Sequence, residues 1–144
     1  MMMRAARIPF RALVTGSLAG LSACADAGAG APDGAAAGRE YRSASVRIWQ
    51  DDLVRVRTEM KGASDEVEAA GYARCVVAGF ALDHGMNFVR NVRTITDKEG
   101  GVWRADAVYS VTSALPAGLS TIDAEVTVED CAERNVPTKA KTAA

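Results

Sequence analysis

The sequence predicts an α+β fold in which one helix packs across the apolar face of a four- to five-stranded antiparallel sheet. Two observations predict it. Several segments alternate apolar and polar residues, which is typical of strands with one buried and one wet face. Between the second and third of these segments runs an apolar stretch without alternation, as expected for a buried helix. The expected order is strand, strand, helix, strand, strand, strand, within residues 40–136. A domain of about 95 residues can build its own modest core.

Residues 41–49, YRSASVRIW, and 53–60, LVRVRTEM, are the first two expected strands. In the second, Val54 and Val56 share one parity and alternate with charged residues. The short polar segment 50–52 lies between the two strands and suits a hairpin loop. We therefore expect these strands to pair antiparallel.

Residues 65–85 are the expected helix, DEVEAAGYARCVVAGFALDHG. Ser64 can cap its N-terminus, and Gly85 suits the left-handed position just after its C-terminus. The helix contains Gly71 and Gly79, each of which costs about 1 kcal/mol of helix propensity. Glycines at these positions would be tolerated where the helix lies close to the sheet.

Three more strands are expected at residues 87–96, 102–111 and 120–130, separated by turns at 97–101 and 115–118. The apolar residues expected on one face of the fourth strand are Trp103, Ala105, Ala107, Tyr109 and Val111. Those of the fifth strand are Ile122, Ala124, Val126 and Val128, which alternate with polar residues. One apolar and one polar face predict a sheet with one wet side.

The charge balance indicates a mildly acidic domain. The whole chain has 17 basic and 18 acidic residues, but three arginines lie in the first eleven residues. The part after residue 23 therefore carries 14 basic and 18 acidic side chains, a net charge of −4. This balance argues against nucleic acid as a partner and predicts low affinity for an anionic membrane surface.

The first 23 residues have the order of a secretory signal peptide. A basic leader, MMMRAARIPFR, precedes a short apolar stretch, ALVTGSLAGLSA. That stretch is too short to span a bilayer, which requires about 20 apolar residues as a helix. It ends at Leu21, Ser22, Ala23 and Cys24, where an ordinary signal peptide would end in an Ala-x-Ala site.

This tetrapeptide resembles the lipobox of bacterial lipoproteins, with leucine three residues before cysteine and small residues between. The resemblance implies that the Cys24 thiol is diacylated, that the chain is cut before Cys24, and that the new amino group is acylated as well. Two or three acyl chains make an anchor stable, whereas one binds only reversibly. Alanine at position 25, where enteric bacteria use aspartate for inner-membrane retention, implies an outer-membrane protein facing the periplasm.

Two further segments are expected to lie outside the folded domain. Residues 24–39 are nearly all alanine and glycine after the cysteine, so they cannot offset their ordering entropy and suit a flexible tether. Such a tether has a typical reach of roughly 20 Å. Residues 137–144 are short and polar, and we expect a disordered tail.

Assigning Cys24 to the lipid leaves Cys75 and Cys131, an even pair in a chain expected to reach an oxidising compartment. We expect these two to form a disulfide that joins the helix to the end of the last strand. The alternative is two independent buried thiols. Their spacing fits no zinc pattern, so we expect no metal and no cofactor.

The sequence offers no clear catalytic constellation. His84, the only histidine, suits a helix-capping role at the end of the helix. Arg74 interrupts the apolar helix and either pairs with a buried carboxylate or extends outward at the rim. Tyr72, Val76 and Phe80 form a possible partner surface, unless a loop or the first strand covers them.

The sequence as a whole resembles the small lipoproteins of Gram-negative envelopes. This resemblance implies a lipid-anchored, periplasm-facing and non-enzymatic module, which binds an envelope protein or a cell-wall component in envelope maintenance or stress sensing. Two alternatives stay open. One is a small periplasmic enzyme with a site that combines Arg74, His84 and a carboxylate. The other is a purely structural lipoprotein.

Overall fold

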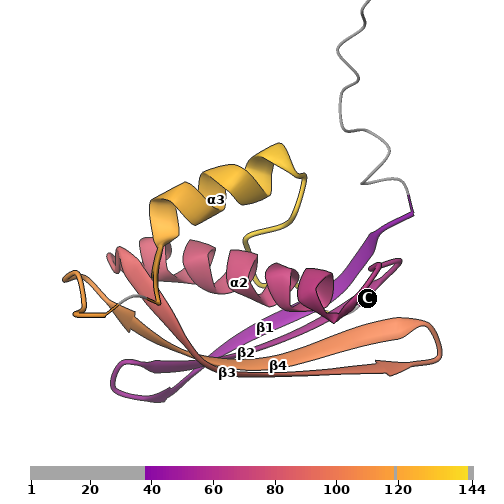
Figure 1. Ribbon diagram of the computed structural model, residues 1–144, viewed down its shortest axis with the longest axis horizontal. Coiled ribbons are helices and arrows are strands. Elements are labelled where there is room, and N and C mark those ends of the chain that lie inside the picture. The colour runs from indigo at the N-terminus through magenta and orange to yellow at the C-terminus, as the bar shows by residue number, and fades with distance from the viewer. Residues whose placement is uncertain (1–37, 119, 143–144) are drawn as a thin grey trace, which may run out of the picture.

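The computed structural model describes residues 38–118 and 120–142, and it has an α+β fold with one antiparallel sheet (Figure 1). The sheet order is β1-β2-β4-β3-β5, and every neighbouring pair is antiparallel. The predicted fold class is confirmed. The expected leader and Cys24 lie outside the described residues. The elements are β1 Glu40–Gln50, β2 Leu53–Lys61, α2 Glu66–Asp83, β3 Phe88–Glu99, β4 Val102–Thr112, β5 Thr121–Asp123 and α3 Ala124–Glu133.

The two long hairpins, β1 with β2 and β3 with β4, turn tightly, and bulges shift their register between Tyr41 and Ser43, between Ile48 and Gln50, and between Asn91 and Arg93. Asp51 and Asp52 form the first turn, and Gly100 and Gly101 form the second. Gly100 and Gly101 have φ angles of 57° and 77°, the left-handed pair that a two-residue hairpin turn requires. Glycine adopts these angles without steric cost.

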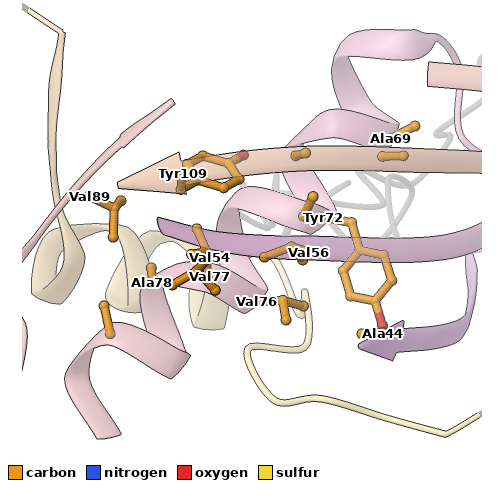
Figure 2. Close-up of a cluster of buried hydrophobic side chains, with 14 of the residues drawn as sticks. Ala44, Val54, Val56, Ala69, Tyr72, Val76, Val77, Ala78, Val89 and Tyr109 are labelled. Carbon is orange, nitrogen blue, oxygen red and sulfur yellow. The ribbon is translucent and has the colours of Figure 1, made fainter. Parts of the chain in front are cut away.

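The core lies between the sheet and α2, which crosses one face of the sheet (Figures 1 and 2). The inward positions of β2 and β4 are almost all buried, as their alternation predicts. Helix α2 is buried on several sides because α3 packs on it opposite the sheet. The contributing side chains include Val54, Val56, Met60, Tyr72, Val76, Val77, Val89, Ala107 and Tyr109.

Helix α2 begins one residue later than Ser64 would place it. Asp65 is the N-cap, because its carboxylate accepts a 2.8 Å hydrogen bond from the Glu68 backbone N–H. The helix ends as expected, with Gly85 at a φ of 71° just after the cap residue His84. The N–H of Gly85 donates to Leu82 O and that of Met86 to Ala81 O, which is the Schellman arrangement.

The expected last strand, residues 120–130, is wrong over most of its length. Only Thr121–Asp123 form a strand, and Ala124–Glu133 form helix α3. The Asp123 carboxylate accepts a 3.1 Å hydrogen bond from the Val126 N–H and starts the helix. Buried Ala124 and Cys131 follow helical spacing, whereas Val126 is 62 % exposed. Local capping and a docking face on α2 therefore outweigh the β propensity of the valines and threonine.

The C-terminal segment, expected to be disordered from residue 137, is held against the domain through residue 142. Lys141 and Ala44 exchange two backbone hydrogen bonds of 2.7 Å, which extend the free edge of β1. Lys139 forms an ion pair with Asp83 at the end of α2. These contacts place the segment beside α2, and they differ from the frayed tail that its composition predicts. None of the described helices is long and apolar enough to cross a membrane.

Candidate functional site

A cleft of about 380 Å³ opens between the start of β1, the first half of α2 and the end of α3. Its volume lies within the range of small ligand sites. Three separate segments build it, so it exists only in the folded domain. Its lining includes Arg39, Tyr41, Ser64, Val67, Glu68, Tyr72, Arg74, Arg134, Asn135 and Val136.

Glu68 is the most strongly held charge in the cleft. Arg39 donates a hydrogen bond from Nε to its Oε1, and Ser64 donates from both N–H and Oγ to Oε2 at 2.8 Å. The hydrogen bond from Arg39, helped by those from Ser64, lowers the pKa of Glu68 to about 2. The carboxylate therefore stays ionised at every pH at which the protein is expected to work.

Tyr72 is one of the residues that line the cleft, and its hydroxyl is buried and lacks a hydrogen-bond partner among the described residues. The side chain is 1 % exposed, and its ring lies 4.8 Å from that of Tyr41, centroid to centroid. Burial raises the pKa of Tyr72 to about 12. Tyr72 is therefore a neutral donor at physiological pH. A buried hydroxyl without a hydrogen-bond partner costs about 1–3 kcal/mol.

Arg74 lies at the mouth of the cleft. It is exposed, in agreement with the outward orientation that we considered, and it makes no ion pair with any of the described residues. A second, smaller hollow of about 220 Å³, between α2 and β3, also has Arg74 in its lining. The guanidinium is thus free to meet an anionic or carbonyl group from either side of the helix.

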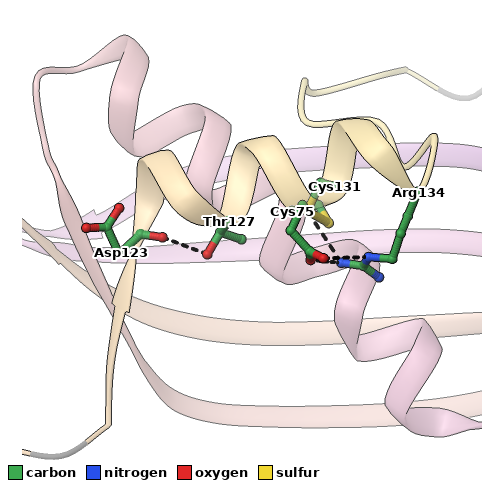
Figure 3. Close-up of a disulfide and its surroundings, with 6 residues drawn as sticks. Cys75, Asp123, Thr127, Cys131 and Arg134 are labelled. Carbon is green, nitrogen blue, oxygen red and sulfur yellow. Dashed lines mark hydrogen bonds and ion pairs between the residues drawn. A yellow bond between two sulfur atoms is a disulfide. The ribbon is translucent and has the colours of Figure 1, made fainter.

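Cys75 and Cys131 join α2 to α3 (Figure 3). Cys75 directly follows Arg74 of the cleft lining, and Cys131 precedes Arg134 of the same lining by three residues. Their sulfur atoms are 1.99 Å apart and their Cα atoms 5.9 Å apart, a geometry compatible with a disulfide. The predicted partners are therefore adjacent. Because Cys131 is in a helix, the link joins two helices, whereas the sequence led us to expect a link to the edge of the sheet.

The end of α3 closes one side of the cleft. Asn135 has a φ of 55°, and the N–H groups of Asn135 and Val136 donate to Ala132 O and Cys131 O. This Schellman turn brings Val136 back over the cleft wall. Cys131 supplies one of these carbonyl groups, so the turn that forms the cleft wall is joined through Cys131 to Cys75 of α2.

The expected partner surface of Tyr72, Val76 and Phe80 is wrong, because these side chains do not form an exposed stripe. Tyr72 and Val76 are 1 % and 0 % exposed, and Phe80 is half-buried. The ring of Tyr41 from β1 covers Tyr72. The alternative, that the first strand covers this side of the helix, is the one the structure supports.

His84 lies at the far end of α2 and does not share the cleft with Arg74. Its ring stacks on Phe80 with centroids 4.0 Å apart, and Nδ1 lies 2.8 Å from Phe80 O. The combined site of Arg74, His84 and a carboxylate is therefore absent. Among the described residues, no group of three or more His, Cys, Asp or Glu could hold a metal ion.

The family of this domain follows from a comparison with known proteins. Residues 41–135 match the family described as the YNQ4 C-terminal domain. The chain belongs to this family. The YNQ4 domain thus runs from β1 to the end of α3, and it includes both paired cysteines and most of the cleft.

A relative from Paracoccus denitrificans bears the description "uncharacterized 26.9 kDa protein in nqo8 5′ region". It is 32 % identical to this YNQ4 domain protein over 94 residues, which are 65 % of this chain and 37 % of the relative. The match thus spans little more than a third of the relative's length. No solved structure matches.

The Arg39–Glu68 pair was not predicted from the sequence. A signal was present, since Asp65 and Glu68 have the three-residue spacing of a capping box, in which the second carboxylate turns back to the helix entrance. In the YNQ4 domain Glu68 does turn back, and it bonds Ser64. The contact with Arg39, 29 residues earlier, depends on the tertiary fold and has no local signal.

Replacing Glu68 with glutamine tests how this pair stabilises the domain. The folded-state pKa lies below the ordinary value of 4.5, so the stabilisation is present above about pH 5 and is lost as the pH falls towards about 2. We expect Glu68→Gln to lower the free energy of unfolding at pH 7 by about 2 kcal/mol, allowing for partial solvent screening. Urea unfolding at several pH values measures this.

The control is Glu129→Gln, which removes an exposed carboxylate from α3. It should change stability by less than about 0.5 kcal/mol. The wild type should lose stability between about pH 5 and pH 2, and Glu68→Gln should lose distinctly less. Equal losses in both proteins would contradict the role given to Glu68.

Proposed function

We propose that this chain is a lipid-anchored, periplasm-facing domain of the bacterial cell envelope that binds a partner and catalyses no reaction of its own. The observation that carries the anchoring is Cys24 at the end of Leu21-Ser22-Ala23, after a basic leader and a short apolar stretch. The adjacent Cys75 and Cys131 support it, because a disulfide persists in an oxidising compartment such as the periplasm.

The protonation states in the cleft favour binding over catalysis. A general acid or base works best with a pKa near the operating pH. Glu68, with a pKa of about 2, and Tyr72, with a pKa of about 12, are both far from neutrality. Instead, the cleft offers a free guanidinium at its mouth. This group suits a partner segment that presents carbonyl or carboxylate oxygens.

Intact mass tests the anchoring. The wild-type chain, produced in a Gram-negative host, should begin at Cys24 and carry the mass of the added acyl chains. Cys24→Ser should remain uncut, whereas Ser22→Ala, which keeps a small residue, should be processed normally. A wild type without acyl mass, or a Cys24→Ser protein cut at the same place, would contradict the proposal.

Recovery of partners from envelope extract tests the binding role of the cleft. We expect the wild type to retain an envelope protein or cell-wall component that Arg74→Glu does not retain. Lys139→Glu, which changes a surface cation outside the cleft, should retain it. If Arg74→Glu and the wild type retained a component equally, the cleft would not be its binding site. Failure to recover any component would favour a purely structural lipoprotein.

A further inference from the structure

The face of the sheet opposite the helices carries a cluster of arginines. Both helices lie on one side of the sheet, which leaves the other side open (Figure 1). Arg47 of β1, Arg55 and Arg57 of β2, and Arg93 of β3 occupy positions on that open side, by their strand register. We call these four residues the arginine face.

Strand pairing places three of the four arginines in one row across the sheet. Arg47 pairs with Arg55, Arg55 with Val108, and Val108 with Arg93. Val108 is 3 % exposed although it lies on the open side, as expected where aliphatic arginine stems flank it. Like charges directly opposite each other destabilise a sheet. The row is therefore an arrangement that folding alone does not favour.

The carboxylates near this row do not balance it. Asp106 accepts hydrogen bonds from Arg55 Nε at 2.8 Å and from Arg57 Nε at 3.1 Å, so one carboxylate serves two arginines. Arg47 and Arg93 are exposed, and neither forms an ion pair with a described residue. The arginine face thus keeps a net charge of +3 when Asp106 is counted. Two other carboxylates on the same side, Glu59 and Glu99, pair with Arg104 and not with these four arginines. Asp97 lies opposite Arg104 in the strand register. The turn aspartates Asp51 and Asp52 lie beyond the end of the paired strands.

The opposite side of the molecule has the reverse charge. Helices α2 and α3 together contain seven carboxylates and a single basic residue, Arg74. The acidic net charge of the domain therefore arises on the helix side. The positive charge of the sheet face cannot be recognised from the net charge of the whole domain. A molecule with this asymmetry orients itself against an anionic surface, with the sheet inward and the helices outward.

We propose that the arginine face binds the anionic phospholipid headgroups of the membrane to which the chain is tethered. The choice of a membrane rests on the proposed lipid anchor. The tether expected from the composition of residues 24–39 would keep the domain within roughly 20 Å of the lipid surface. Arg47 lies seven residues beyond Glu40 along β1, or about 23 Å. Trp49, two residues beyond, is 60 % exposed, and tryptophan favours the membrane–water interface.

Vesicle binding by the unacylated mature chain tests this inference independently of the anchor. The protein is residues 24–144 with Cys24→Ser, and the vesicles contain phosphatidylcholine with or without phosphatidylglycerol. We expect binding only when phosphatidylglycerol is present, and loss of binding at high ionic strength. Arg47→Gln/Arg93→Gln should bind about thirtyfold more weakly, because each cation near an anionic surface contributes about fivefold.

The matched control is Lys98→Gln/Lys139→Gln, which removes the same charge away from the arginine face. Lys98 lies over the Trp103 ring, whose position is on the helix side, and Lys139 pairs with Asp83. This control should bind like the parent protein. Equal weakening by both double variants, equal binding to both kinds of vesicle, or binding to poly-glutamate in preference to vesicles would overturn the proposal. The last result would indicate an acidic protein partner instead.

The outcome is separable from that of the anchoring experiment. Acyl mass on the native protein together with no vesicle binding would leave the anchor intact and remove the role of the arginine face. Vesicle binding together with an unacylated native protein would support the role of the arginine face and contradict the proposed anchor.

Discussion

The variant Cys75→Ala/Cys131→Ala is expected to be about 4 kcal/mol less stable than the oxidised protein. The two cysteines are 56 residues apart, and a bond that closes a loop of this length restricts the unfolded chain by about that amount in the chain-entropy model. Domains of this size have total stabilities of about 5–15 kcal/mol. The loss would therefore remove a large share of the stability. Urea unfolding of the mature chain in a Cys24→Ser background measures it.

The reduced parent protein is the control for this variant, because it loses the bond and keeps the cysteine side chains. It should unfold at nearly the same urea concentration as Cys75→Ala/Cys131→Ala. If the oxidised and reduced parent proteins were equally stable, the two sulfur atoms would not be bonded in solution, and the argument for an oxidising compartment would fail.

Loss of the bond should affect α3 first. An isolated helix of ten residues is not stable in water, and α3 depends on its packing against α2. Since the turn after α3 forms one wall of the cleft, we expect that reduction also opens the cleft. Hydrogen exchange should show faster exchange of α3 amides in the reduced protein, while the amides of β2 and β4 stay protected.

The sequence predicted the elements whose signals are local. Strands β2 and β4 alternate over most of their length, and their inward positions Val56 and Ala107 are fully buried. Helix α2 is marked at its C-terminus by Gly85, which adopts the expected left-handed conformation. In each case a periodic pattern ends at a residue with a defined backbone preference. The pattern within the element and the residue at its end therefore predict the same structure.

Helix α3 was missed because its residues satisfy two periods at once. Val126 and Val128 alternate with polar residues as in a strand, while Ala124 and Cys131 follow the spacing of a helix. The pairing of Cys131 with Cys75 on the far side of α2 selects the helical solution, and that contact is 56 residues away in sequence. A local sequence pattern therefore cannot predict this contact.

The arginine face was missed for a related reason. Composition after residue 23 gives a net charge of −4, which predicts low affinity for an anionic membrane surface. Whether Arg47 and Arg93 share a face depends on pairing through β2 and β4, and on the bulge between Asn91 and Arg93 that shifts the register. A shift of one residue would move every later side chain of β3 to the other face.

Gly79→Ala and Gly71→Ala are expected to change stability in opposite directions, although both replace a glycine in α2. A Cβ atom at Gly79 would lie 2.1 Å from the backbone oxygen of Thr138, whereas one at Gly71 would have no atom within 4 Å. We expect Gly71→Ala to stabilise the domain by about 1 kcal/mol, from helix propensity alone. Gly79→Ala should destabilise it by about 2 kcal/mol, because overpacking outweighs the same gain in propensity. Thermal unfolding of the two variants beside the wild type measures both.

The pair also tests where the C-terminal segment lies. The sequence suggested that glycines in this helix make room for the sheet, but at Gly79 the close neighbour is Thr138. If Gly79→Ala displaces the segment, the two hydrogen bonds between Lys141 and Ala44 should break, and exchange of the Ala44 amide should accelerate. Stabilisation by Gly79→Ala equal to that by Gly71→Ala would mean that residues 138–142 leave the helix in solution, and that the free edge of β1 is open.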